Sequence, residues 1–202
     1  MSQPGAIETE FGVPIPGRIL PADQWARTAI KRLPPPGPLD WSALFGRTAP
    51  VVLELGCGNG RFTLLSALAR PEMDHFASDV LPVVIRYATR RGNQRGLHNV
   101  RFAVKDAQTF VASYVAPGSV AEVHLYHPQP YHDPRQAHRR LVTPRFLADV
   151  HRALGPGGRV RLALGNDGHQ GGEDRGLGHG GPAPGKGHCA TEHPQDPGQI
   201  GP

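Results

Sequence analysis

Three glycines spaced two apart follow a run of apolar residues in the segment 51–60, "VVLELGCGNG". The apolar, β-branched residues predict a buried strand over 51–55, and glycines after such a strand let the backbone approach a ligand closely. Asp79 lies 19 residues after Gly60, at the end of the next apolar segment. A carboxylate at that place can accept hydrogen bonds from both hydroxyls of a ribose, so the spacing predicts a nucleoside site.

The spacing of the glycines and a nearby acid indicate which kind of nucleoside the turn would bind. The turn reads GxGxG, whereas dinucleotide sites read GxGxxG and keep the N-terminus of the next helix free for a pyrophosphate. Glu54 precedes the turn, and a carboxylate there suits a ligand with positive charge, such as the ammonium and sulfonium groups of S-adenosylmethionine. Two alternatives stay open: dinucleotide binding, and a turn that only packs a helix against a strand.

With a further acid in "VKDAQ", the chain resembles the class I S-adenosylmethionine-dependent methyltransferases. The resemblance implies that the turn holds the methionine part of the cofactor, that the acid after the second strand holds the ribose, and that the acid after the third strand lies by the adenine. The implied cofactor-binding residues are Glu54, Gly56, Gly58, Gly60, Asp79 and Asp106.

The segment 124–140, "HLYHPQPYHDPRQAHRR", follows the fourth expected strand. Open parallel sheets place their reacting groups beyond the carboxyl ends of the strands. The segment resembles the tRNA guanine-N7 methyltransferase family, whose fourth strand ends in Phe-Pro-Asp-Pro-Trp, followed by His-Lys and a basic stretch ending in Lys-Arg-Arg. The similarity runs over residues 51 to about 164. It implies methyl transfer to N7 of a guanine in tRNA, with tRNA as the partner.

The same resemblance assigns the substrate side of the site. Gln129 and Tyr131 would line the base pocket, and Arg139 and Arg140 would contact phosphate. Asp133, where the family has a lysine, and Asp167, near the family's aspartate and threonine after the fifth strand, are further substrate-binding candidates.

Gln129 stands where the family has an acid, so it offers hydrogen bonds without negative charge. Guanine N7 carries an exposed, unprotonated lone pair and can attack the methyl group without a general base. Catalysis then consists of alignment, and no proton-transfer residue is assigned. Two alternatives to this reading remain. "HPQPY" also resembles the Asn/Asp-Pro-Pro-Tyr motif of amino-group methyltransferases. The chain could instead be a truncated, non-catalytic RNA-binding remnant.

Apolar segments near 51–55, 75–80, 100–104, 121–126 and 159–164 alternate with helical patterns over 82–92 and 144–154. This alternation predicts an α/β, Rossmann-like domain over 51–167, with a mostly parallel sheet and helices on both faces. The proline-rich residues 1–50 predict an arm with one short helix around 23–31. The Gly/Pro-rich residues 168–202 predict a disordered tail, as a reading-frame shift would produce, and the last strands of the sheet are expected to be missing.

Composition sets the remaining expectations. The 202 residues are enough for one domain with a core, and a net charge of +5 favours a polyanionic partner. The sequence has no long apolar run or secretion signal and only two cysteines, so we expect a cytoplasmic protein without disulfides or a metal. We expect a monomer. Arginines beside the second helix, at 90, 91 and 95, are candidates for phosphate contacts.

Overall fold

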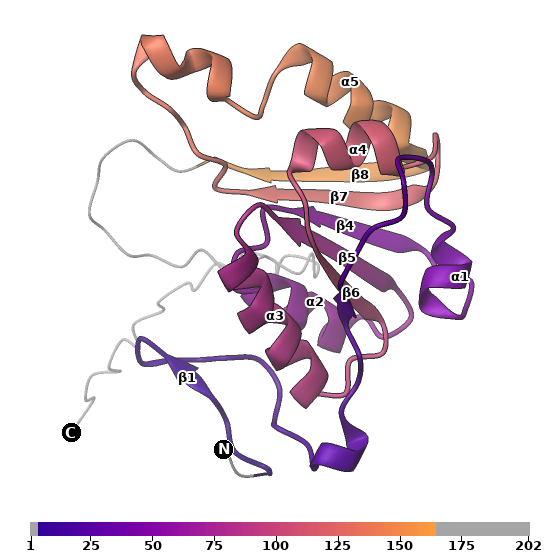
Figure 1. Ribbon diagram of the computed structural model, residues 1–202, viewed down its shortest axis with the longest axis vertical. Helices are drawn as coiled ribbons and strands as arrows, with labels where there is room; N and C mark the ends of the chain where they lie inside the picture. The colour runs from indigo at the N-terminus through magenta and orange to yellow at the C-terminus, as the bar shows by residue number, and fades with distance from the viewer. Residues whose placement is uncertain (1–3, 165–202) are drawn as a thin grey trace, which may run out of the picture. The chain divides into compact units, whose positions relative to one another are not determined.

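The computed structural model describes residues 4–164 and contains a six-stranded parallel sheet (Figure 1). Across the sheet the strand order is β3-β6-β5-β4-β7-β8. The bounds are β3 Ala29–Ile30, β4 Val51–Leu55, β5 Asp74–Asp79, β6 Val100–Val104, β7 Val120–Tyr126 and β8 Leu154–Ala163. From β4 the chain builds outward to β5 and β6, then returns to the other side of β4 for β7 and β8. The order therefore reverses at β4, and such a switch point leaves a crevice at the carboxyl ends of the strands.

Helices cover both faces of the sheet (Figure 1). On one face lie α2 (Arg61–Ala69) and α3 (Pro82–Gln94), and on the other lie α4 (Ala107–Tyr114) and α5 (Pro144–Ala153). The short α1 (Trp41–Phe45) joins the second group through Phe45.

Each helical layer encloses its own apolar core. Phe76 of β5 belongs to a cluster with Phe110 of α4 and Phe146 of α5, whereas the next residue, Ala77, belongs to a cluster with residues of α2 and α3. Alternate residues of a strand point to opposite faces, which is why one central strand can serve both layers. The expected Rossmann-like α/β fold, a mostly parallel sheet with helices on both faces, is confirmed.

The N-terminal region differs from the expected arm. The expected helix around residues 23–31 is absent, and in its place are a 3-10 turn, η1 (Ala22–Gln24), and strand β3 at the edge of the sheet. Hydrogen bonds to distant residues hold this stretch extended. The carbonyl oxygen of Thr28 accepts a hydrogen bond from the backbone N–H of Phe102. The N–H and the hydroxyl of Thr28 donate to Asn93 Oδ1 at 2.8 and 2.9 Å. Upstream, β1 (Thr9–Glu10) and β2 (Val13–Pro14) form an antiparallel hairpin.

Strand β8 begins at Leu154, earlier than the expected start at 159. Leu154 pairs with Val120 and Arg159 pairs with Glu122, so the segment "GPGG" between them is accommodated as an irregularity in the register. The expected disordered tail and the expected loss of further strands both concern residues beyond Leu164, outside the described residues.

Candidate active site

A cavity of about 580 Å³ lies at the carboxyl ends of β4, β5, β6 and β7, at the switch point of the sheet. Its walls bring together predicted residues from segments far apart in the chain. Both the cofactor-binding set and the base-binding set contribute: Gly56, Asp79, Asp106, Gln129, Tyr131, Arg139 and Arg140. A volume of this size falls in the range of small-molecule and cofactor sites.

The glycine turn is tied to β5 by backbone hydrogen bonds. The N–H groups of Gly56 and Cys57 donate to the carbonyl oxygen of Ser78 at 2.8 and 3.0 Å. Gly56 and Gly58 have φ values of 78° and 52°, and a Cβ on either would meet nothing within 4 Å. These glycines are therefore required by the backbone conformation, and they leave open space beside the turn.

Asp79 links the turn to the next helix. Its Oδ2 accepts a hydrogen bond from the N–H of Gly58 at 2.9 Å, and its Oδ1 accepts one from the N–H of Leu81 at 3.0 Å. A carboxylate offers about four acceptor sites, so lone pairs remain for ribose hydroxyls on the cavity side. Asp106 caps α4 by accepting from the N–H of Thr109 at 2.7 Å and also lines the cavity.

Glu54 is only 5% exposed and is not among the residues that line the cavity. Alternation along β4 turns its side chain toward α2, where the hydroxyl of Thr63 donates to Glu54 Oε2. Burial raises the pKa of Glu54 to about 7, although the hydrogen bond from Thr63 opposes the rise. Gly58 and Gly60 also lie outside the cavity wall.

Tyr126, the last residue of β7, lies in the cavity wall and is close enough to Glu54 for that carboxylate to affect its pKa. Burial, followed by the nearby charge of Glu54, raises the pKa of the Tyr126 phenol to about 12. Within the described part of the chain, its buried hydroxyl has no hydrogen-bond partner. Such an unpaired polar group beside a cavity is available to a ligand.

The loop after β7 has a strained backbone at two cavity residues. His127 and Tyr131 have φ values of 49° and 45°, which are uncommon for residues with a side chain. Strain of this kind gathers at functional sites. Arg140 braces the loop by donating to the carbonyl oxygens of Pro130 and Tyr131 at 3.0 to 3.2 Å. The Arg139 guanidinium lies 4.9 Å from the centre of the Tyr131 ring, a cation–π contact.

Two predicted substrate residues lie elsewhere. Asp133 caps the 3-10 helix η2 (Pro134–Arg139) and forms an ion pair with Arg135 at 2.9 Å, and it is not part of the cavity wall. Asp167 lies outside the described residues.

The expected phosphate-binding role of two arginines is wrong for this structure. The side chains of Arg91 and Arg95 are 3% and 1% exposed, because both are buried in ion pairs with Glu8 of the N-terminal region. Only Arg90 of that group keeps a half-exposed side chain.

The cavity also contains Lys105 and Gln108, which the sequence analysis did not single out, and His127 and His138 of the segment 124–140, to which it assigned no binding role. A positional signal was present for Lys105 and His127, since each directly follows a strand of a parallel sheet. No comparable signal marked His138, which reaches the cavity from η2.

Residues 4–164 contain no group of His, Cys, Asp and Glu side chains that could hold a metal ion. In the same range, no helix combines the length and apolar character needed to span a bilayer.

Comparison with known proteins identifies the family of the chain. Residues 48–165 match the model of a family described as "Putative methyltransferase", and the chain belongs to that family. The methyltransferase class indicated by the sequence is thereby confirmed.

The names of individual relatives are more specific than the description of the family. The chain is 39% identical over 128 residues to a tRNA (guanine-N(7)-)-methyltransferase of Paracidovorax citrulli, covering 63% of this chain and 51% of the relative. It is 35% identical over 139 residues to the protein of the same name from Alkalilimnicola ehrlichii, covering 69% and 59%. The chain thus spans about half the length of the curated relatives it matches. Among solved structures, the antibiotic-resistance methyltransferase Kmr matches with a TM-score of 0.49 and 25% identity, covering 63% of this chain and 59% of Kmr.

Proposed function

We propose that this protein transfers the methyl group of S-adenosyl-L-methionine to N7 of a guanine in tRNA. One observation carries the proposal: a single cavity joins Gly56, Asp79 and Asp106, which are expected to hold the cofactor, to Gln129 and Tyr131, which are expected to hold the base. Relatives at 35–39% identity bear the name of this activity, which supports the choice of tRNA as substrate. A cytoplasmic location and a monomeric state are part of the same proposal.

The cofactor side of the cavity fits S-adenosyl-L-methionine. The open space beside Gly56, in the cavity wall, would admit the methionine part, and the spare lone pairs of Asp79 suit the ribose. Asp106, two residues after β6, lines the same cavity and would lie by the adenine. The buried carboxyl of Glu54 stands behind the turn as a source of negative potential when ionised. When bound, the cofactor supplies an electrophilic methyl group on a sulfonium.

The substrate side positions the base rather than activating it. Guanine N7 needs no deprotonation, so the chemistry depends on aligning N7 with the methyl carbon and the sulfur. Tyr131, fixed by Arg139, offers a ring for stacking, and the Gln129 amide offers a donor and an acceptor to the base edge. Arg139 remains available for a phosphate at the mouth of the cavity.

Methylation of unmodified tRNA tests this proposal. The chain is incubated with labelled S-adenosyl-L-methionine and tRNA, and 7-methylguanosine is located by aniline cleavage. We expect incorporation at guanine by the wild-type chain and a loss of at least tenfold in Asp79→Asn, because that variant weakens both the turn and the ribose contact. Asp23→Asn, an exposed carboxylate outside the cavity wall, is the matched control and should retain full activity.

The alternatives predict different results. Binding of S-adenosylhomocysteine without methyl transfer would support the RNA-binding remnant, and a labelled amino group would support an amino-group methyltransferase. Tight binding of NAD with no affinity for S-adenosylhomocysteine would overturn the assignment of the cofactor.

A further inference from the structure

The N-terminal hairpin, formed by β1 and β2, is fixed to α3 by buried ion pairs. Glu8, directly before β1, lies 3.1 Å from Arg91 Nε and 3.3 Å from Arg95 Nη2. Directly after β2, Ile15 is buried in the apolar cluster that also contains Cys57 of the glycine turn. Both arginines would be buried without a counter-charge if the hairpin moved away, so the hairpin is an integral part of the fold.

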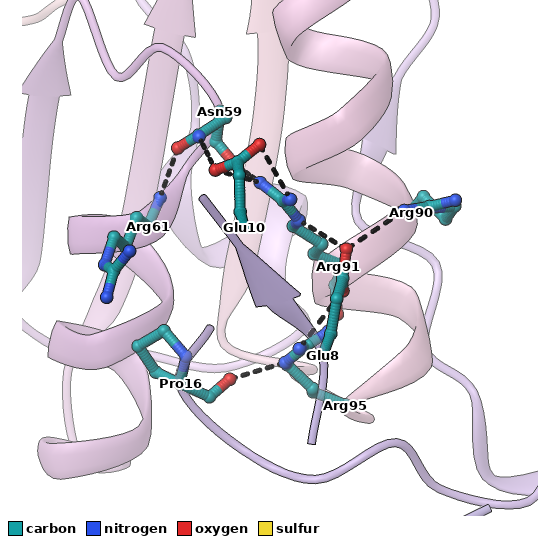
Figure 2. Close-up of polar contacts among 8 residues, drawn as sticks. All are labelled: Glu8, Glu10, Pro16, Asn59, Arg61, Arg90, Arg91 and Arg95. Carbon is teal, nitrogen blue, oxygen red and sulfur yellow. Dashed lines mark hydrogen bonds and ion pairs between the residues drawn. The ribbon is translucent and has the colours of Figure 1, made fainter. Parts of the chain in front are cut away.

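Glu10 of this hairpin also contacts the glycine turn. In Figure 2 its carboxylate lies between the guanidinium of Arg91 and the side chain of Asn59. Arg91 Nη2 lies 3.1 Å from Glu10 Oε1, and the side-chain amide of Asn59 donates to Glu10 Oε2. Asn59 Oδ1 accepts a hydrogen bond from the backbone N–H of Arg61, the first residue of α2, at 3.3 Å. The side chain of Asn59 thus joins the hairpin to the start of α2.

Different elements hold the two ends of the turn. Its first residues donate backbone N–H groups to the end of β5, and Gly58 donates to Asp79 Oδ2 at 2.9 Å. Asn59, the next residue, is held by the hairpin and by Arg91 Nη1, which donates to its carbonyl oxygen at 3.4 Å. A shift of Asn59 would pull the N–H of Gly58 away from Asp79, the carboxylate expected to hold the ribose of the cofactor.

We propose that Glu10 is a positioning residue for the cofactor, because its hydrogen bond from Asn59 holds the glycine turn in the conformation that binds S-adenosyl-L-methionine. This inference rests on the proposed cofactor site. Neither residue is among those that line the cavity, so both act through the turn and not by touching the cofactor. A turn that is already held in its bound conformation loses less conformational entropy when the ligand binds. The N-terminal region thereby contributes to cofactor binding from 49 residues away in the chain.

The test exchanges the donor and the acceptor of this contact in the full chain. Asn59→Asp keeps the acceptor for Arg61 but sets a second carboxylate against Glu10. Calorimetry with S-adenosylhomocysteine should show roughly tenfold weaker binding by this variant. The double variant Glu10→Gln/Asn59→Asp restores a hydrogen bond of opposite polarity and the original net charge. Its affinity should return to within about twofold of the wild-type value.

Glu8→Gln is the matched control. Glu8 shares Arg91 with Glu10, but within residues 4–164 its side chain bonds to arginines on or just after α3 and not to the turn. Glutamine keeps an acceptor for those arginines. This variant should bind S-adenosylhomocysteine with the wild-type affinity, even where the weaker ion pairs lower its unfolding temperature.

Hydrogen exchange without cofactor gives a second readout. The amide of Gly58, bonded to Asp79 in the wild-type chain, should exchange roughly tenfold faster in Asn59→Asp. In the double variant it should exchange at the wild-type rate. A general loss of stability would speed exchange throughout the fold, whereas the loss of this contact should affect the turn.

Each outcome decides a separate question. Wild-type affinity and exchange in a folded Asn59→Asp variant would overturn the role of Glu10 and leave the proposed function standing. Weak binding that the double variant does not recover would also overturn that role, because the added charge and not the lost contact would then be the cause. A wild-type chain without affinity for S-adenosylhomocysteine would overturn the assignment of the cofactor, and the positioning role with it.

Discussion

Two acids of the site differ in their relation to solvent. Asp79 stands at the end of β5 with hydrogen bonds from two backbone N–H groups, and it faces the cavity. Glu54 stands inside β4 with one hydrogen bond, from Thr63, and is buried. Burial disfavours the ionised form of a carboxyl group that lacks a cationic partner. Burial therefore raises the pKa of Glu54 to about 7, whereas Asp79 faces the cavity directly.

The pKa of Glu54, raised to about 7 mainly by burial, predicts a pH-dependent stability. The folded state holds the proton more tightly than the unfolded state does, so this contribution is full below pH 4.5 and is lost as pH rises to about 7. Glu54→Gln removes the titration. Between pH 5 and pH 8, the variant should lose roughly 1–3 kcal/mol less unfolding free energy than the wild-type chain.

Urea unfolding at the two pH values measures this difference. Glu72→Gln, which replaces an exposed acid, should lose as much stability as the wild-type chain. An equal loss in Glu54→Gln would show that Glu54 does not titrate in this range.

At the scale of elements, the turn after β4 must sit close to α3. Gly60 has a φ of 77°, and a Cβ added there would lie 2.7 Å from the Cβ of Ala88 and 3.3 Å from the ring of Phe102. Gly58 shares the positive φ but faces open space. Both glycines are required by a positive φ, but only Gly60 is also required by the close packing of α3 against the turn.

Gly60→Ala should destabilise the protein more than Gly58→Ala does. Both variants place a side chain at positive φ, at a cost of roughly 1 kcal/mol. Gly60→Ala additionally forces α3 away from the turn, which costs roughly a further 1–3 kcal/mol. Chemical unfolding of both variants beside the wild-type chain makes the comparison, and equal losses would show that the contact with Ala88 relaxes freely.

For the whole molecule, the net charge of +5 overstates the positive charge that a ligand can reach, because some arginines are bonded within the fold. Arg91 and Arg95 are used inside the fold, and Arg140 holds the loop after β7. Arg139, at the mouth of the cavity, rests on Tyr131 and keeps its charge for a ligand. The molecule therefore presents fewer free arginines to a polyanion than its composition suggests.

Arg139→Gln should reduce the salt dependence of tRNA binding. Losing one phosphate contact lowers the slope of log K against log salt by roughly 0.7–0.9. Arg27→Gln is the control, because Arg27 is exposed and follows Ala26, whose N–H bonds to Asn93 near the C-terminal end of α3, away from the cavity. Slopes are measured over a salt titration. An unchanged slope in Arg139→Gln would exclude a phosphate contact at this residue.

The sequence alone was sufficient for the core of the fold and for the outline of the site. The strands β4 to β7 and the helices α3 and α5 lie within about two residues of their expected places, because apolar periodicity and helix caps are local signals. The glycine turn and Asp79 meet because parallel strands align their carboxyl ends, a rule that a linear reading can apply.

Tertiary structure alone decided which charged residues are available at the surface and which are buried in the fold. Arg91 and its partner Glu8 are 83 residues apart, and Thr28 bonds to Asn93 across 65 residues. No local pattern encodes such pairings, because they depend on which distant backbone segments the fold brings together. For that reason the extended N-terminal region and the buried arginines appeared only in three dimensions.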